Sequence, residues 1–205
     1  LPEQCGFDGL AVRRALLTGS PDATFRVRLQ EPTEAHGVEV TRLMRESRHF
    51  HHPWVSAPCD LPAWRRFLER VNRSNEAVFL IRRQQDDALC GVVNLNIITY
   101  EALCSAYLSY YAVATMAGRG YMKEGLQLLL KFAFEELHLH RVEANIQPGN
   151  ENSVRLVESL GFECEGYSPR FLRINGRWRD HERWALCDDR RALRASPHRR
   201  CRRCS

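Results

Sequence analysis

The strongest limit on how this chain can fold comes from a glycine-rich turn between a strand pattern and a long helical pattern. Residues 105–113 alternate as a strand does, and the turn at 116–120 contains Gly118 and Gly120. A helix is then predicted over 121–137, because apolar residues recur at helical spacing: Met122, Leu126, Leu129, Leu130, Ala133 and Leu137. The fold must therefore place a helix start directly after the end of a strand.

Patterns on either side of this unit predict further strands and helices. Thr33 and Asp60 are suitable caps for two early helices, and Asn175-Gly176 is a hairpin signal between the last two strands. The predicted strands cover about 24–29, 77–82, 89–98, 105–113, 141–147, 162–173 and 181–187, and the predicted helices about 33–47, 60–71, 121–137 and 151–160. The order β-α-α-β-β-β-α-β-α-β-β predicts a mixed α/β domain.

The positive charge of the chain is confined to its C-terminal end. The 205 residues carry a net charge of +5, and residues 188–205 hold seven Arg and two Asp, which accounts for all of it. We therefore expect a neutral folded domain at 24–187, an N-terminal extension at 1–23 and a disordered Arg-rich tail at 188–205. Such a tail can alternatively contact RNA or another polyanion.

Cysteine usage and hydropathy predict a cytoplasmic protein. The eight Cys are scattered and several lie in apolar strand patterns, which is typical of free thiols in a reducing compartment. No run approaches the roughly 18 apolar residues of a membrane helix. Residues 1–23 also lack the apolar stretch of a secretory signal.

No metal site is predicted. A structural zinc needs about four ligands. The pair Cys201 and Cys204 has only His198 nearby in the sequence. Three histidines in the first half also lack partners at ligand spacing: His49, His51 and His52.

Two helix starts are the candidate binding sites. The turn at 118–120 lets the backbone approach a ligand, and the helix behind it offers unpaired N–H groups and a positive dipole end. Asn150 is a candidate N-cap of the later helix, with Ser153 in its first turn. Each segment alone is equally explained by a tight turn or an ordinary cap, and the Rossmann and P-loop spacings are missing. Together, on either side of strand 141–147, they predict a site for a phosphate-bearing ligand.

Four motifs resemble the GNAT acetyltransferase superfamily: 118–125 (GRGYMKEG), 140–145 (HRVEAN), 150–153 (NENS) and 160–166 (LGFECEG). Segments 46–54 (ESRHFHHPW) and 173–181 (RINGRWRDH) are similar to the branch that acetylates the N-terminal alanine of ribosomal proteins. The resemblance covers about residues 24–187. It implies a central mixed, mostly antiparallel sheet flanked by helices, with acetyl-CoA as co-substrate.

The resemblance also assigns roles to individual residues. The amides of 118–122 would hold the coenzyme A diphosphate, and the strand edge at 111–113 would bind the pantetheine arm and polarise the thioester. Asn150 would bond the pantetheine, and Ser153 would be the general acid that protonates the leaving thiolate. Other members use a Tyr four residues further on, where this chain has Val157. The expected cofactor-binding residues are Tyr111, Ala112, Val113, Ala117, Gly118, Arg119, Gly120, Tyr121, Met122, Asn150 and Ser153.

The loop departs from the family pattern at two positions. Ala117 stands where a Gln or Arg usually opens the loop, and Met122 stands where a small residue is usual. Ala117 removes one side-chain contact to the cofactor. We expect Arg119 and Lys123 to compensate for it with their positive charge.

The acceptor implied by the resemblance is the N-terminal α-amine of a ribosomal or other protein. An α-amine has a pKa near 8 against about 10.4 for Lys, so much more of it is neutral near pH 7 and it needs little help from a base. The expected substrate-binding residues are Glu46, Phe50 and Trp54. The sequence does not distinguish among four candidate bases: Glu46, Glu101, Asp180 and His181.

Two alternative functions stay open at this point. One is acetylation of a small amine, such as an amino acid, a polyamine or an aminoglycoside. A closed acidic pocket would favour this acceptor, and an open groove would favour a peptide. The other is a non-catalytic module that docks on RNA or the ribosome through residues 188–205. A monomer or homodimer without membrane contact is expected in each case.

Overall fold

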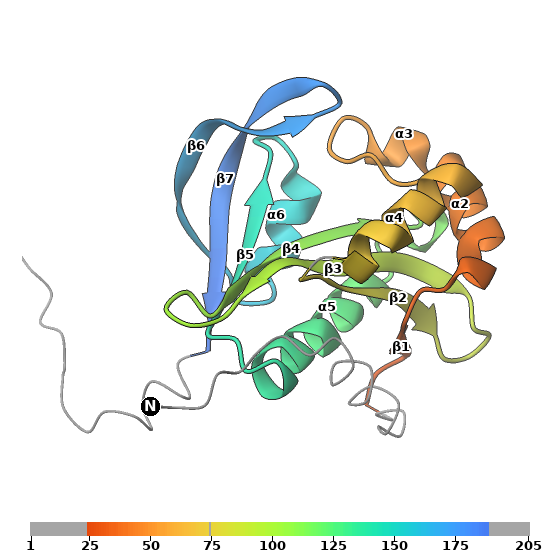
Figure 1. The fold of residues 1–205 in the computed structure, drawn as a ribbon, viewed down its shortest axis with the longest axis horizontal. Helices are drawn as coiled ribbons and strands as arrows, with labels where there is room; N and C mark the ends of the chain where they lie inside the picture. Colours follow the sequence, from red (N-terminus) through yellow and green to blue (C-terminus); the bar gives the residue numbers. More distant parts are fainter. Residues whose placement is uncertain (1–23, 74, 189–205) are drawn as a thin grey trace, which may run out of the picture.

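The computed structural model describes residues 24–73 and 75–188 (Figure 1). The expected extension at 1–23, and the expected tail apart from Asp188, lie outside the described residues. The described part folds as one sheet with helices on both faces (Figure 1). None of its helices combines the length and the apolar character that crossing a membrane requires.

The sheet has seven strands in the order β1-β2-β3-β4-β5-β7-β6. Neighbouring strands are antiparallel except for β4 and β5, which are parallel. This confirms the prediction of a mixed, mostly antiparallel sheet. The strands are β1 (Val27–Gln30), β2 (Ala77–Arg83), β3 (Leu89–Thr99), β4 (Ser105–Ala112), β5 (Arg141–Ile146), β6 (Glu163–Ile174) and β7 (Arg177–Cys187).

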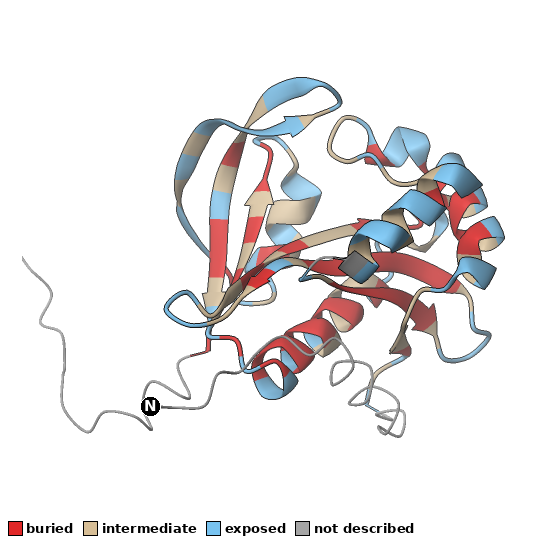
Figure 2. Ribbon diagram, viewed as in Figure 1, coloured by how far each residue is buried: buried red, intermediate tan, exposed pale blue. Residues whose placement is uncertain are grey.

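Helices pack on both faces of the sheet, as Figure 1 shows. Met44 of α2 and Trp64 of α4 pack on one face, in a cluster with Val92 of β3. Leu126 of α5 packs on the other face, in a larger cluster that includes Phe79 of β2. The helical segments are η1 (Glu34–His36), α2 (Gly37–Glu46), α3 (Arg48–His51), α4 (Leu61–Arg73), η2 (Ala114–Met116), α5 (Tyr121–Lys131), η3 (Phe132–Glu136) and α6 (Glu151–Glu158). Figure 2 shows the buried residues concentrated on the central strands and the inner side of α5.

The sheet opens between its two parallel strands. The pairing of β4 with β5 starts at Ser105 and Arg141 and ends at Leu108 and Ala144. Beyond that point β4 continues to pair with β3 as far as Ala112, while β5 continues to pair with β7. The last part of β4 therefore has an edge without a paired strand in the middle of the sheet (Figure 1).

Helix boundaries differ from the predictions in three places. The helix predicted over 121–137 is α-helical only to Lys131 and then widens into a π turn, in which the Leu137 amide donates to the Phe132 carbonyl at 3.0 Å. No helix is predicted between 47 and 60, but the short helix α3 lies there. The early helix begins with the 3-10 turn η1 after Thr33. Apolar periodicity does not distinguish these variants of helical backbone.

The hairpin signal at Asn175-Gly176 is confirmed. Both residues have positive φ, 50° and 77°, as a tight hairpin turn requires. Strand β7 begins at Arg177 and not at 181 as predicted. Consequently His181 lies inside a strand, paired with Ser168 of β6.

Candidate active site

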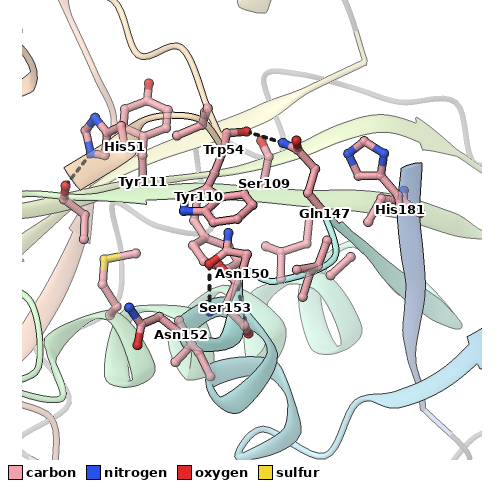
Figure 3. A pocket seen from close by; sticks show the side chains of 18 of the residues that line it. His51, Trp54, Ser109, Tyr110, Tyr111, Gln147, Asn150, Asn152, Ser153 and His181 are labelled. Atoms are coloured by element: carbon pink, nitrogen blue, oxygen red, sulfur yellow. Dashed lines mark hydrogen bonds between the residues drawn. The ribbon is translucent and has the colours of Figure 1, made fainter. Parts of the chain in front are cut away.

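A single cavity of about 1140 Å³ passes through the opening between β4 and β5. At one end it is lined by the starts of α5 and α6, and at the other by α3 and the β6–β7 hairpin (Figure 3). Both candidate helix starts therefore contribute to the same cavity. The lining residues that these two helix starts supply are Gly118, Gly120, Met122, Lys123, Asn150, Asn152, Ser153, Arg155 and Leu156.

The start of α5 presents exposed backbone to the cavity. Gly118 and Gly120 are exposed and have φ of 73° and 84°, a left-handed conformation that costs glycine nothing. Gly120 is the N-cap, so the amides of Tyr121 to Lys123 have no acceptor within the helix. The side chain of Lys123 also lines the cavity. This combination of free amides, dipole and positive charge suits an anionic group.

The loop is fixed from outside by Arg26, next to β1. Its amide donates to Glu124 Oε2 at 2.7 Å, and its Nη2 donates to the Arg119 carbonyl at 3.0 Å. The guanidinium also lies 4.9 Å from the centroid of the Tyr121 ring. Arg119 and Tyr121, both expected at the cofactor, are not among the residues that line the cavity.

Of the three amides expected at the edge of β4, those of residues 111–113, only the Ala112 amide faces the cavity. The Val113 amide donates to the Cys90 carbonyl of β3 at 2.8 Å, so Val113 faces β3 and does not line the cavity. Because N–H groups alternate in direction along a strand, the Tyr111 amide also faces β3, although Tyr111 itself lines the cavity, and the amides of Tyr110 and Ala112 face the opening. The prediction for Val113 rests on its position in the sequence alone. That position does not determine which amides of a strand point towards which neighbouring strand.

His51 of α3 caps the end of this edge. Its Nε2 lies 2.7 Å from the Ala112 carbonyl oxygen, which can only accept, so Nε2 carries the proton (Figure 3). Burial lowers the pKa of His51 and keeps the ring neutral near pH 7. The Ala112 carbonyl is thereby engaged, while its amide still faces the cavity.

The start of α6 carries Asn150 and Ser153 into the same cavity. Asn150 Oδ1 accepts a hydrogen bond from the Ser153 amide at 3.3 Å, as an N-cap does, which leaves its Nδ2 as the group available to a ligand (Figure 3). Across the opening, the Tyr110 hydroxyl donates to the Ser153 carbonyl at 3.4 Å. Burial raises the pKa of Tyr110 to about 12, so this donor stays protonated.

Aromatic and neutral polar side chains line the opposite end of the cavity. Phe50 and Trp54 line the cavity, together with Phe171 of the β6–β7 hairpin. Gln147 donates to the Trp54 carbonyl at 2.9 Å and ties the end of β5 to the segment after α3 (Figure 3). Among the residues lining this cavity, all within the described ranges, none is an Asp or a Glu. This end of the cavity is thus apolar and without negative charge.

Glu46 does not lie in the cavity. Its carboxylate accepts from Arg42 at 3.0 Å on the exposed side of α2. Of the other candidate bases, Glu101 lies in the turn after β3, and the Asp180 carboxylate is bonded to the Tyr167 hydroxyl and the Arg170 amide. Of the four, His181 is the one that lines the cavity.

Sequence reasoning missed several polar residues of the cavity, among them Ser109, Asn145 and Gln147. Ser109 accepts from Asn96 Nδ2 at 2.9 Å, and the buried Oδ1 of Asn145 has no hydrogen-bond partner. Ser109 and Asn145 occupy strand positions next to core residues, and Gln147 directly follows β5, which is the signal available in the sequence. Which of the two strand faces is lined by a cavity depends on the opening of the sheet. The described residues contain no group of three or more potential ligands arranged for a metal.

The sheet opens at its single parallel pair of described strands, with two helix starts on one side and an aromatic-lined end on the other, so the cavity suits an extended ligand whose anionic group lies at the helix starts. Residues 26–163 match the family described as "Acetyltransferase (GNAT) domain". Since this range is more than half of the 205 residues, the chain belongs to the GNAT acetyltransferase family.

Three relatives illustrate the range of the family. A probable N-acetyltransferase of Bacillus subtilis (strain 168), YjcK, is 38% identical over 120 residues, 58% of this chain and 66% of that protein, just under two thirds of its length. The [ribosomal protein uS5]-alanine N-acetyltransferase of Escherichia coli (strain K12) is 32% identical over 149 residues, 69% of this chain and 77% of that protein. A spermidine N(1)-acetyltransferase of Vibrio cholerae is 28% identical over 117 residues, 57% of this chain and 66% of that protein.

Among solved structures, Mycobacterium smegmatis RimJ in complex with CoA-disulfide is similar to this chain. It superposes with a TM-score of 0.72 at 24% identity, over 80% of this chain and 83% of that one. The predicted GNAT fold is thereby confirmed. The chain is an N-acetyltransferase by family, and its acceptor is a separate question.

Proposed function

We propose that this chain transfers the acetyl group of acetyl-CoA to the N-terminal α-amine of a protein, with a ribosomal protein that starts with alanine as the first candidate. The observation that carries the proposal is one continuous cavity with two different ends. The end at the start of α5 is suited to an anionic group, and the other end is aromatic and uncharged. The relative that modifies the alanine of ribosomal protein uS5 supports this acceptor.

Acetyl-CoA fits the cavity in one direction. The diphosphate would bind the amides of the 118–122 loop, with Lys123 adding a charge. The pantetheine arm would then lie along the edge of β4 that β5 leaves unpaired. There the Ala112 amide would donate a hydrogen bond to a carbonyl oxygen of the ligand. Asn150 Nδ2 would donate to the pantetheine from the other side. The thioester would thus lie in the opening of the sheet.

Acetyl transfer needs a neutral amine, a donor for the oxyanion and a proton for the thiolate. The amine nitrogen attacks the thioester carbonyl carbon, and the carbonyl oxygen gains negative charge that a β4 amide stabilises. The C–S bond then breaks, and Ser153 gives its proton to the departing sulfur and is reprotonated from water. The nitrogen, now part of the amide, loses its surplus proton to a base or to water. Ser153 takes this role because it lines the cavity beside Asn150, and the position used by Tyr in other members is the buried Val157.

A polyamine acceptor is the main alternative, since a spermidine acetyltransferase is among the relatives. A polyamine keeps several positive charges while one amine reacts, and those charges need carboxylate partners. The lining residues include neither Asp nor Glu, so a polyamine would gain little there. A peptide places uncharged backbone and a small side chain against Phe50, Trp54 and Phe171.

The experiment is a direct competition between acceptors. Purified protein is incubated with acetyl-CoA and with two acceptors, spermidine and a peptide that starts with alanine. The mass of each acceptor is then measured by mass spectrometry. The proposal predicts a gain of one acetyl group on the peptide α-amine, with spermidine unmodified. The same peptide with a blocked N-terminus but a free Lys is the control and should stay unmodified. Preferential acetylation of spermidine would reverse the assignment of the acceptor.

A further inference from the structure

His181 is a buried titratable residue of the cavity that the scheme above does not use. His181 is only 2% exposed, and together with Phe171 it lines the acceptor end of the cavity. The Phe171 ring lies edge-on to the imidazole, with 6.1 Å between the two ring centroids. In Figure 3 its ring extends from β7 towards the side of the cavity that holds Gln147. The strand register supports this placement. Ile146, the last residue of β5, pairs with Glu182 of β7, so the residues one step further along, Gln147 and His181, lie next to each other.

The hydrogen bonding of His181 fixes which ring nitrogen carries the proton. Nδ1 lies 3.0 Å from the carbonyl oxygen of Arg179 on the same strand. A carbonyl oxygen can only accept, so Nδ1 is the protonated nitrogen of the neutral ring. Nε2 therefore has a free lone pair. This is the tautomer that a proton acceptor requires.

The environment keeps this ring neutral at the pH of the reaction. Burial lowers the pKa of His181, while the bond to Arg179 and the charge of Asp180 oppose the fall. The Asp180 carboxylate is itself engaged by the Tyr167 hydroxyl and the Arg170 amide of β6.

Other charged groups near the ring belong to the same hairpin. Glu182 points to the opposite face of β7, where it accepts from the indole of Trp184, while Arg179 and Arg183 are the charged residues two positions away on the ring's own face. The side of the cavity formed by α3 and β5 contributes the neutral His51 and Gln147. No lining residue supplies a carboxylate that would hold a proton on the ring.

We propose that Nε2 of His181 is the general base that takes the proton from the attacking amine, an inference that rests on the proposed acetyl transfer. As the new N–C bond forms, the nitrogen carries one surplus proton, which moves to Nε2 directly or through one water. The C–S bond breaks and the sulfur takes its proton from Ser153. The imidazolium then releases its proton to water, so one proton leaves nitrogen and one joins sulfur. This selects one residue from four candidates and places the base on the acceptor side of the sheet.

The decisive variant is His181→Asn. An Asn amide can still donate to the Arg179 carbonyl, but it offers no basic nitrogen. We expect kcat for an alanine-starting peptide to fall about 100-fold, with the KM for acetyl-CoA unchanged. His52→Gln is the matched control, because His52 is exposed and outside the cavity, and it should keep the wild-type rate.

Rescue by a free base separates a chemical role from a structural one. His181→Ala leaves a space of imidazole size at the acceptor end, so added imidazole should raise its turnover in proportion to concentration. The same imidazole should leave wild type and Ser153→Ala unchanged. A His181→Asn turnover within about twofold of wild type, or a loss in a folded His181→Ala that imidazole does not reverse, would overturn the proposal.

The proposed acetyl transfer and the role of His181 would be contradicted by different results. If wild type binds acetyl-CoA by calorimetry but acetylates no amine, the proposed function falls and the inference falls with it. If wild type acetylates the peptide and His181→Asn does so equally fast, only the role of His181 is wrong. Thermal unfolding of each variant shows whether a lost rate is a lost fold.

Discussion

The hydroxyl of Tyr110 on β4 donates to the backbone carbonyl of Ser153 in the first turn of α6, at 3.4 Å. This bond crosses the opening of the sheet, where β4 and β5 no longer pair. It links the strand edge that would hold the pantetheine arm to the helix start that carries the proposed acid. The geometry of the reaction therefore depends on a contact between residues 43 positions apart in the sequence.

Tyr110→Phe should lower stability and weaken the alignment of α6. Losing one partly buried hydrogen bond costs about 0.5–1.5 kcal/mol of the free energy of unfolding. We also expect kcat to fall more than the affinity for acetyl-CoA does, since the diphosphate end of the cavity is unaffected. Urea unfolding and steady-state kinetics measure both effects. An unchanged kcat would show that this contact does not position Ser153.

Ser153→Ala should lower kcat about 10–100-fold with little change in acetyl-CoA affinity, because general-acid help is lost while the backbone contacts remain. The matched control is Ser159→Ala at the far end of the same helix, because Ser159 does not line the cavity and its hydroxyl donates to the Leu156 carbonyl. Stopped-flow or steady-state release of free thiol measures the rate. Equal rates for Ser153→Ala and wild type would remove Ser153 from the mechanism.

Gly120→Val should both destabilise the fold and weaken coenzyme A binding. A side chain at φ of 84° costs about 1–3 kcal/mol, and an added Cβ would lie 3.0 Å from Arg26 Nη2. Gly176→Val supplies the control, because Gly176 has φ of 77° in the β6–β7 turn, and an added Cβ there has nothing within 4 Å. Calorimetry should show weakened binding in the first variant and unchanged binding in the second. Equal affinities would contradict the assignment of the loop.

The stability of the protein should fall as the pH drops below about 6.5. Burial lowers the folded-state pKa of His36, His51 and His181, so in this window the unfolded chain binds protons that the folded chain does not. Each such group contributes a slope of at most about 1.4 kcal/mol per pH unit, and stability rises with pH. His51→Gln keeps a donor for the Ala112 carbonyl and removes one titration. Its unfolding free energy should depend less steeply on pH, and an unchanged slope would contradict the buried neutral state of His51.

The local elements of the fold follow from local patterns in the sequence. Helical spacing after Gly120 predicts α5, and Asn175-Gly176 predicts the turn between β6 and β7. Asn150 caps α6 through the same side chain that the sequence suggested. Each of these depends on residues within one turn of one another, which is why the sequence is sufficient.

The opening of the sheet and the phase of its ladder depend on pairing between distant strands. Val113 was expected to face the cofactor, but its amide is bonded to Cys90, more than twenty residues away. Glu46 was expected at the substrate, but α2 turns it outward to Arg42. The sequence offers His181 as one of four equal candidate bases. Its position inside β7 follows only from the start of that strand at Arg177. Periodicity shows that a residue alternates, and only tertiary pairing decides which side it faces.

The central claim is that the starts of α5 and α6 bind one coenzyme A molecule between them. Hydrogen–deuterium exchange with and without coenzyme A tests this claim most directly. The account predicts slower exchange of the amides at 118–123 and, in the same titration, at 150–153, with the exposed turn at 84–88 unchanged. Protection of neither helix start, or protection only at the aromatic-lined end of the cavity, would contradict it.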